Sequence, residues 1–119
     1  MTTPVNPKIP YGAILGRVIG HHRDLRHITQ ETLASVLGIS QSAYSRLEKG
    51  HSGMTVAQLN AIAPHLGMTA GQLLQATEGY AAHLRAGGTE ITDQKPEASA
   101  APALLIALGI LAALIAAQS

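Results

Sequence analysis

Apolar residues recur through residues 11–86 at three- and four-residue steps, the spacing that places them on one face of an α-helix. Turn signals interrupt this pattern, so it predicts five consecutive helices whose apolar faces share one core. The expected helices cover about residues 11–26, 30–37, 41–49, 56–66 and 70–77, with 78–86 as an extension of the fifth. Pro64 should shorten or kink the fourth helix. The residues expected in the core are Leu33, Leu37, Ile39, Leu47, Leu59, Ile62 and Leu73.

The segment from residue 29 to residue 50 joins two of these helices through a short turn. Gly38 supplies the backbone freedom that ends the first helix, and Ser40 is suited to cap the second. Tyr44 and Leu47 belong to the buried side of the second helix. Its other side carries polar and cationic groups that suit base edges and phosphates, which indicates a helix-turn-helix built to enter a DNA major groove. These groups are Gln41, Ser42, Ser45, Arg46 and Lys49.

The same segment resembles the Cro/CI-type helix-turn-helix proteins, also called the XRE family, over about residues 15–75. The matching residues, in order, are Thr29-Gln30-Glu31, Leu33-Ala34, Gly38-Ile39-Ser40-Gln41 and Arg46-Leu47-Glu48-Lys49-Gly50. The resemblance implies an all-α, five-helix, lambda-repressor-like domain. It also implies that Gln30 touches a DNA phosphate and that Gln41 reads a base. One departure is His22, which stands where the family usually has an apolar residue.

The residues predicted to bind DNA are Gln30, Ser40, Gln41, Ser42, Ser45, Arg46 and Lys49. An amide in the first turn of the groove helix, such as Gln41, can bond adenine at N6 and N7, and Arg46 can bond guanine or a phosphate. The alternatives are a solvated polar face for Gln41 and an ion pair for Arg46. Further phosphate candidates, which could equally be solvated surface residues, are Arg17, Arg23 and Arg26.

Composition limits the chemistry that the chain can support. A length of 119 residues fits one small domain with appendages, and the absence of cysteine excludes disulfides, thiolate zinc sites and cysteine nucleophiles. The net charge of +1 is low for a DNA-binding protein, but residues 1–88 carry seven Lys/Arg against four Asp/Glu. The sequence has no phosphate-binding glycine loop, paired carboxylates or histidines at metal-ligand spacing. We therefore predict no enzymatic activity, no cofactor and no metal.

The two ends of the chain differ from the central pattern. Residues 1–10 hold three prolines and are expected to form a flexible arm, and residues 87–101 are expected to form a linker. Residues 102–117 predict a helix that is apolar on every side, which must be buried in lipid or protein. The uncharged residues 98–117 would span about 30 Å, the thickness of a hydrocarbon core.

We predict from this length that residues 98–117 anchor the protein in the inner membrane, with the DNA-binding domain in the cytoplasm. A first alternative is a helix for self-association, with a coiled-coil seam. The remaining alternatives are a hydrophobic degradation signal and packing of this helix against the domain itself. The coiled-coil seam of the self-association helix would consist of Leu104, Leu108, Leu111 and Ile115.

Together these features predict a sequence-specific, repressor-like DNA-binding transcriptional regulator. A homodimer or higher oligomer would place groove helices about 34 Å apart on a pseudo-palindromic site in double-stranded DNA. One alternative is a membrane-linked scaffold protein that binds protein through its helix-turn-helix, although Gln41 and Arg46 favour DNA. Another alternative is an antitoxin-type autorepressor, which would also bind DNA.

Overall fold

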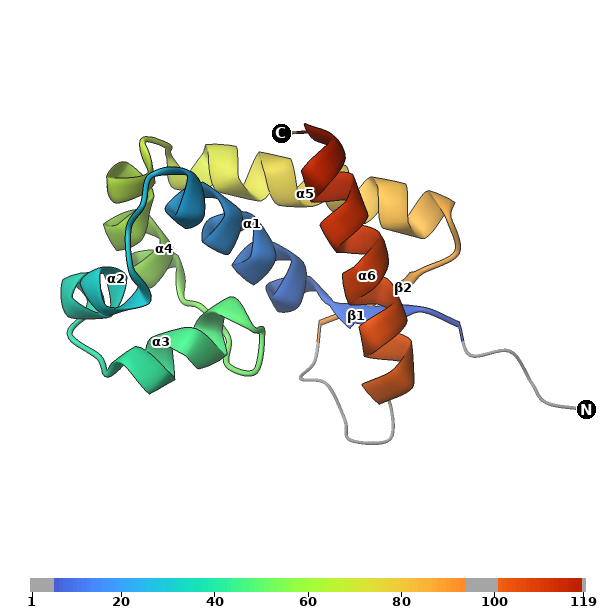
Figure 1. Ribbon diagram of the computed structural model, residues 1–119, viewed down its shortest axis with the longest axis horizontal. Coiled ribbons are helices and arrows are strands. Elements are labelled where there is room, and N and C mark those ends of the chain that lie inside the picture. The colour runs from blue at the N-terminus through green and yellow to red at the C-terminus, as the bar shows by residue number, and fades with distance from the viewer. Residues whose placement is uncertain (1–5, 94–100, 119) are drawn as a thin grey trace, which may run out of the picture.

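The computed structural model describes residues 6–93 and 101–118, which form a helical domain with one short pair of strands. In Figure 1, α2, α3 and α4 gather at one end of the molecule, α1 and α5 run lengthwise, and α6 lies with the strands towards the other end. The elements in chain order are β1 (Lys8–Pro10), α1 (Tyr11–Leu25), α2 (Gln30–Leu37), α3 (Gln41–Glu48), α4 (Val56–Ile62), η1 (Ala63–Leu66), α5 (Ala70–Ala86), β2 (Glu90–Thr92) and α6 (Ala101–Gln118). The predicted all-α, helix-turn-helix fold is confirmed, and the one short pair of strands was not predicted.

Hydroxyl side chains define the starts of four consecutive helices. Each is an N-cap whose oxygen accepts a backbone N–H from the first helical turn, a group that has no partner within the helix. At the starts of α4 and α5 a glutamine returns a bond to the cap residue and completes a capping box. This repeated signal explains why the predicted helix starts agree with the observed ones. The four caps are Thr29, Ser40, Thr55 and Thr69.

Pro64 shortens the fourth helix as predicted. The α-helical part of α4 ends at Ile62, and the chain continues as the tighter 3₁₀ helix η1. Proline has no N–H and its ring crowds the preceding turn, so it cannot continue a regular α-helix. Gly67 then ends the element with a positive φ of 69°.

The main core lies between α1, α2, α3, α4 and the first half of α5. Five of the seven expected core residues are buried, whereas Leu37 and Ile39 are half-buried at its edge. Tyr44 is also fully buried, as its place on the inner side of α3 indicates. The five buried residues are Leu33, Leu47, Leu59, Ile62 and Leu73.

His22 is half-buried on α1. Burial lowers its pKa, and the neighbouring His21 and Arg26 lower it further. The imidazole is therefore neutral near pH 7, which explains how it can replace the apolar residue expected at this position.

Two segments that were expected to be irregular pair as parallel strands. Residues 8–10 form β1 and residues 90–92 form β2, with Ile9 opposite Ile91. The predictions of a flexible arm over 1–10 and a linker over 87–101 are therefore wrong for these residues. Strands of three residues leave no readable alternation, and their stability comes from tertiary burial, since Ile9 is fully buried. Residues 1–5 and 94–100 lie outside the described residues.

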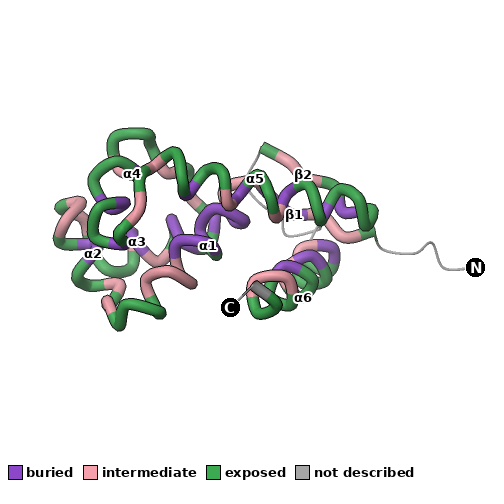
Figure 2. Tube along the Cα trace, turned by 90° about the horizontal axis from the view of Figure 1, so that it is seen from above, coloured by how far each residue is buried: buried purple, intermediate pink, exposed green. Residues whose placement is uncertain are grey.

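The C-terminal helix α6 packs against the domain. Ala107 and Leu111 are fully buried in a second cluster that also contains Ile9, Ile14 and Leu84. In Figure 2 the buried residues of α6 lie along its side nearest the domain and the exposed ones along the opposite side. Packing against the domain is therefore the alternative observed for one face of this helix.

Two other interpretations of this helix were a membrane anchor and a coiled-coil seam. None of the helices in residues 6–93 and 101–118 is both long and apolar enough to cross a bilayer, so the predicted membrane anchor gains no support. The predicted coiled-coil seam is wrong as drawn, because it requires Leu111, which the domain buries. Self-association through another face of α6 remains a prediction.

Candidate nucleic-acid interface

The turn between α2 and α3 contains Gly38 in a left-handed backbone conformation. Gly38 has a φ of 67°, a left-handed conformation that is strained for other residues. The N–H groups of Gly38 and Ile39 donate to carbonyls near the end of α2, so the last turn of that helix is satisfied. Ile39 packs against the core, which sets the position from which α3 begins.

The outer side of α3 forms a polar surface. Its members are spaced alternately by one and three residues, so they share one face of the helix. They are residues 41, 42, 45, 46 and 49. Ser45 is half-buried, whereas the other residues of this face are exposed. Ser40 is exposed too, but its Oγ accepts the Ala43 N–H at 3.1 Å and acts as the helix cap. The exposed members of the face are Gln41, Ser42, Arg46 and Lys49.

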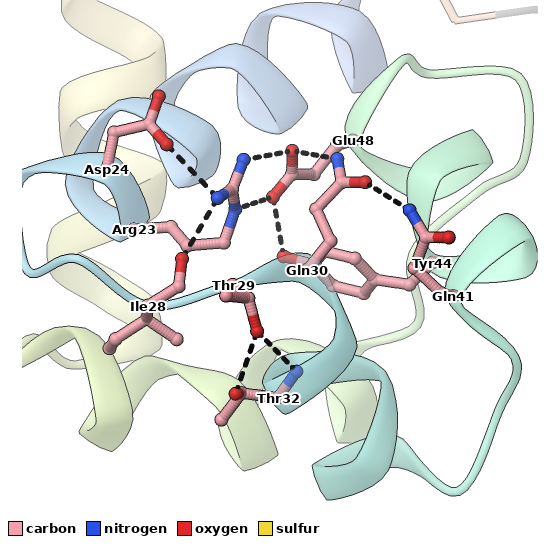
Figure 3. A network of polar contacts seen from close by, with 9 residues as sticks. All are labelled: Arg23, Asp24, Ile28, Thr29, Gln30, Thr32, Gln41, Tyr44 and Glu48. Atoms are coloured by element: carbon pink, nitrogen blue, oxygen red, sulfur yellow. Dashed lines mark hydrogen bonds and ion pairs between the residues drawn. The ribbon is translucent and has the colours of Figure 1, made fainter.

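Gln30, at the start of α2, joins this surface through two hydrogen bonds (Figure 3). Its Oε1 accepts from Gln41 Nε2 at 3.0 Å, and its Nε2 donates to Glu48 Oε2 at 2.9 Å. The first side chain of α3 is thus connected through α2 to the last residue of α3. The structure brings together the two glutamines that the sequence predicted separately.

Glu48 is the centre of this polar network, although it is only 7% exposed. Its carboxylate accepts Arg23 Nε at 2.7 Å and Nη2 at 3.2 Å, and it accepts the Tyr44 hydroxyl at 2.8 Å. A hydrogen bond to this carboxylate raises the pKa of the Arg23 guanidinium, while burial and the Glu48 charge raise that of the Tyr44 phenol. Both groups therefore remain protonated donors at neutral pH.

Arg23 was predicted as a candidate for phosphate contacts, and the structure gives it another role. Besides Glu48, its guanidinium donates to the Ile28 carbonyl oxygen at 3.0 Å and to Asp24 Oδ1 at 3.1 Å. All three of its nitrogen atoms therefore donate within the domain. Glu48 was not predicted from the sequence as a structural residue. The available signal was its position four residues after the buried Tyr44, which places both on the same face of α3.

Glycines let α1 approach the end of α3 at backbone distance. Gly12, Gly16 and Gly20 follow at four-residue steps on one face of α1. A Cβ on Gly16 would lie 1.9 Å from the carbonyl oxygen of Glu48, and one on Gly20 would lie 3.2 Å from its Oε2. The position of α3 relative to α1 therefore depends on the missing side chain at residue 16.

Comparisons with known proteins agree with this architecture. Residues 21–73 match the protein family described as helix-turn-helix. A crystal structure of the clp gene regulator ClgR from Corynebacterium glutamicum is similar, with a TM-score of 0.60 and 23% identity, covering 65% of this chain and 82% of that one. A second crystal structure of ClgR has a TM-score of 0.54 and 23% identity, covering 58% and 90%. No curated protein sequence matches. At this identity the ClgR structures show a shared fold.

Proposed function

We propose that the chain is a Cro/CI-type (XRE) helix-turn-helix regulator, as the family match over residues 21–73 supports, and that it regulates transcription by binding a specific double-stranded DNA sequence. The observation that carries the proposal is the exposed polar face of α3, whose first side chain, Gln41, is oriented by Gln30. In the proposed complex α3 enters the major groove with this face towards the bases.

The hydrogen bonds within the pair leave groups available for DNA. The Gln41 amide nitrogen uses one hydrogen on Gln30, so its second hydrogen and its Oε1 can meet N7 and N6 of an adenine. Gln30 likewise uses one amide hydrogen on Glu48 and retains another for a phosphate. Arg46 and Lys49 are exposed farther along α3, where a guanidinium can reach guanine and an ammonium can reach a phosphate.

Gln41→Ala and Arg46→Ala are each expected to weaken specific DNA binding by about 1–3 kcal/mol. The reason is the loss of a base contact, so affinity for a scrambled duplex should change less. Gln30→Ala should weaken specific and scrambled duplexes more evenly, because its partner is a phosphate. Fluorescence anisotropy with a duplex selected from genomic DNA measures both affinities.

The matched control is Gln75→Ala, which removes an exposed glutamine from α5, outside the helix-turn-helix. It should leave both affinities unchanged. Full specific affinity in both Gln41→Ala and Arg46→Ala would remove these residues from base recognition and refute the proposed orientation of α3.

We further propose that the chain binds DNA as a homodimer through the outer face of α6. Leu105, Ile106 and Ile110 are 69%, 42% and 38% exposed, a large apolar area for one short helix. Ile106, Ile110, Ala113 and Ala117 follow at steps of four, three and four residues and form one face. An antiparallel pair about a two-fold axis would set the isoleucines of one copy against the alanines of the other.

Ile110→Glu is expected to convert the dimer to a monomer, because it places a charge in an apolar interface. The mass is measured by sedimentation equilibrium, and affinity for a pseudo-palindromic duplex should fall while affinity for a half-site is retained. Val56→Glu is the matched control, since Val56 is a 72% exposed residue on α4. A wild-type protein that is monomeric at all concentrations, or an Ile110→Glu variant that remains dimeric, would contradict this interface.

A further inference from the structure

A cleft of about 770 Å³ separates the second half of α6 from the side of the domain where α1 meets the ends of α2 and α3. Its volume is typical of pockets for small molecules. The α6 wall is aliphatic and includes Leu108, Ala112 and Ile115. The opposite wall is polar and includes Arg17 and Lys49.

The cleft stays open because an aliphatic wall on α6 faces a polar and charged wall on the domain. The residues of α6 that fit the domain, Ala107 and Leu111, are buried against β1, α1 and α5. The next face of α6, with Leu108 and Ile115, is only half-buried and is turned towards Gly20 and the charged residues of α1. The glycine offers no side chain to fill the space, and charged groups do not close over an aliphatic surface without losing hydration.

The polar wall carries a net charge of +1, since three cations, Arg17, Arg23 and Lys49, face two carboxylates, Asp24 and Glu48. Both carboxylates pair with Arg23, so the negative charges of this wall lie together around that residue. Arg17 and Lys49 are exposed, and neither makes an ion pair within the part of the chain that the structure describes. A ligand therefore meets cations on one side and hydrocarbon on the other.

We propose that this cleft binds an amphipathic carboxylate, with its aliphatic chain along α6 and its charged head towards Arg17 and Lys49. The aliphatic wall favours a chain of methylenes, and the uncompensated cations favour one negative charge. DNA fits less well, because its backbone has no aliphatic surface to cover Leu108 and Ile115. The inference does not depend on the proposed DNA recognition, since the ligand site can be measured without DNA.

The test is isothermal titration calorimetry of the full chain with hexanoate, octanoate and decanoate. Affinity should rise by about fourfold for each added methylene. Decylamine has the same chain length as decanoate but the opposite charge, so it should bind at least tenfold more weakly. Arg17→Gln should weaken decanoate about tenfold, whereas Arg85→Gln, which removes an exposed cation from α5 outside the cleft, should not.

A second variant tests the aliphatic wall. Ala112→Phe fills the cleft from an exposed position on α6, so it should weaken decanoate at least tenfold while leaving the helical circular dichroism unchanged. The proposal is overturned if wild-type protein does not bind decanoate, or if Arg17→Gln and Ala112→Phe bind it as well as wild type. It is equally overturned if Arg17→Gln lowers DNA affinity in a protein that binds no decanoate, because the occupant is then a DNA phosphate.

Discussion

Replacing Glu48 with alanine is expected to lower the free energy of unfolding by about 3 kcal/mol, because the change removes the buried carboxylate that pairs with the half-buried Arg23 guanidinium. Arg23 would lose two hydrogen bonds, and the Tyr44 hydroxyl, inside the core, would lose its acceptor. Gln30 would also lose the bond that orients its amide. Chemical denaturation followed by circular dichroism measures the difference.

The double variant Arg23→Ala with Glu48→Ala separates the pair from its surroundings. Removing both charges should restore part of the lost stability, since the half-buried cation that has lost its Glu48 partner is then absent. Glu31→Ala removes an exposed acid from the first turn of α2 and should cost about 1 kcal/mol or less. If Glu48→Ala is no more destabilising than Glu31→Ala, the network does not stabilise the fold.

Gly16→Ala is expected to destabilise the domain by about 3 kcal/mol or more, at the upper end of the cost of overpacking. The added Cβ would lie 1.9 Å from the carbonyl oxygen of Glu48, and this neighbour is backbone that cannot rotate away. The helices α1 and α3 must therefore separate. DNA affinity should fall as well, since α3 carries the proposed recognition surface.

Gly79→Ala provides the matched control for this substitution. It makes the same change in the interior of α5, where a Cβ would meet no described atom within 4 Å. Alanine is the better helix former, so this variant should gain about 0.5–1 kcal/mol. Equal effects of the two substitutions in thermal unfolding would show that the contact between α1 and α3 does not require glycine.

The helical domain could be predicted from the sequence because its signals are local. The caps Thr29, Ser40, Thr55 and Thr69 and the breaker Pro64 each act within one turn of their own helix. The strands could not be predicted, because the pairing of Ile9 with Ile91 depends on two segments far apart in the chain. The position of α6 was equally hidden, since a helix that is apolar on all sides does not indicate which face is buried.

For the polar surface too, local features could be predicted from the sequence and contacts between helices could not. Gln30 and Gln41 could be predicted as residues of the DNA-binding surface because each begins a helix. Their hydrogen bond to each other could not be predicted, because it joins two different helices. The pairing of Arg23 with Glu48 joins residues 25 positions apart, and one of them, Arg23, was predicted as a candidate for phosphate contacts. The residue type alone does not show whether an arginine on a helix is exposed to solvent or paired with an acid of another helix.

The parallel pairing of β1 with β2 has a consequence for the order in which the molecule assembles. During synthesis Ile9 emerges early, but its partner Ile91 follows only after all five helices of the domain. The contacts within α1 to α4 are closer in sequence, so they can form while β1 still has no partner. The strand pair and then α6, which packs on Ile9, are therefore expected to form last, and a released chain that ends at residue 88 would carry a folded helix-turn-helix with its N-terminal strand unpaired.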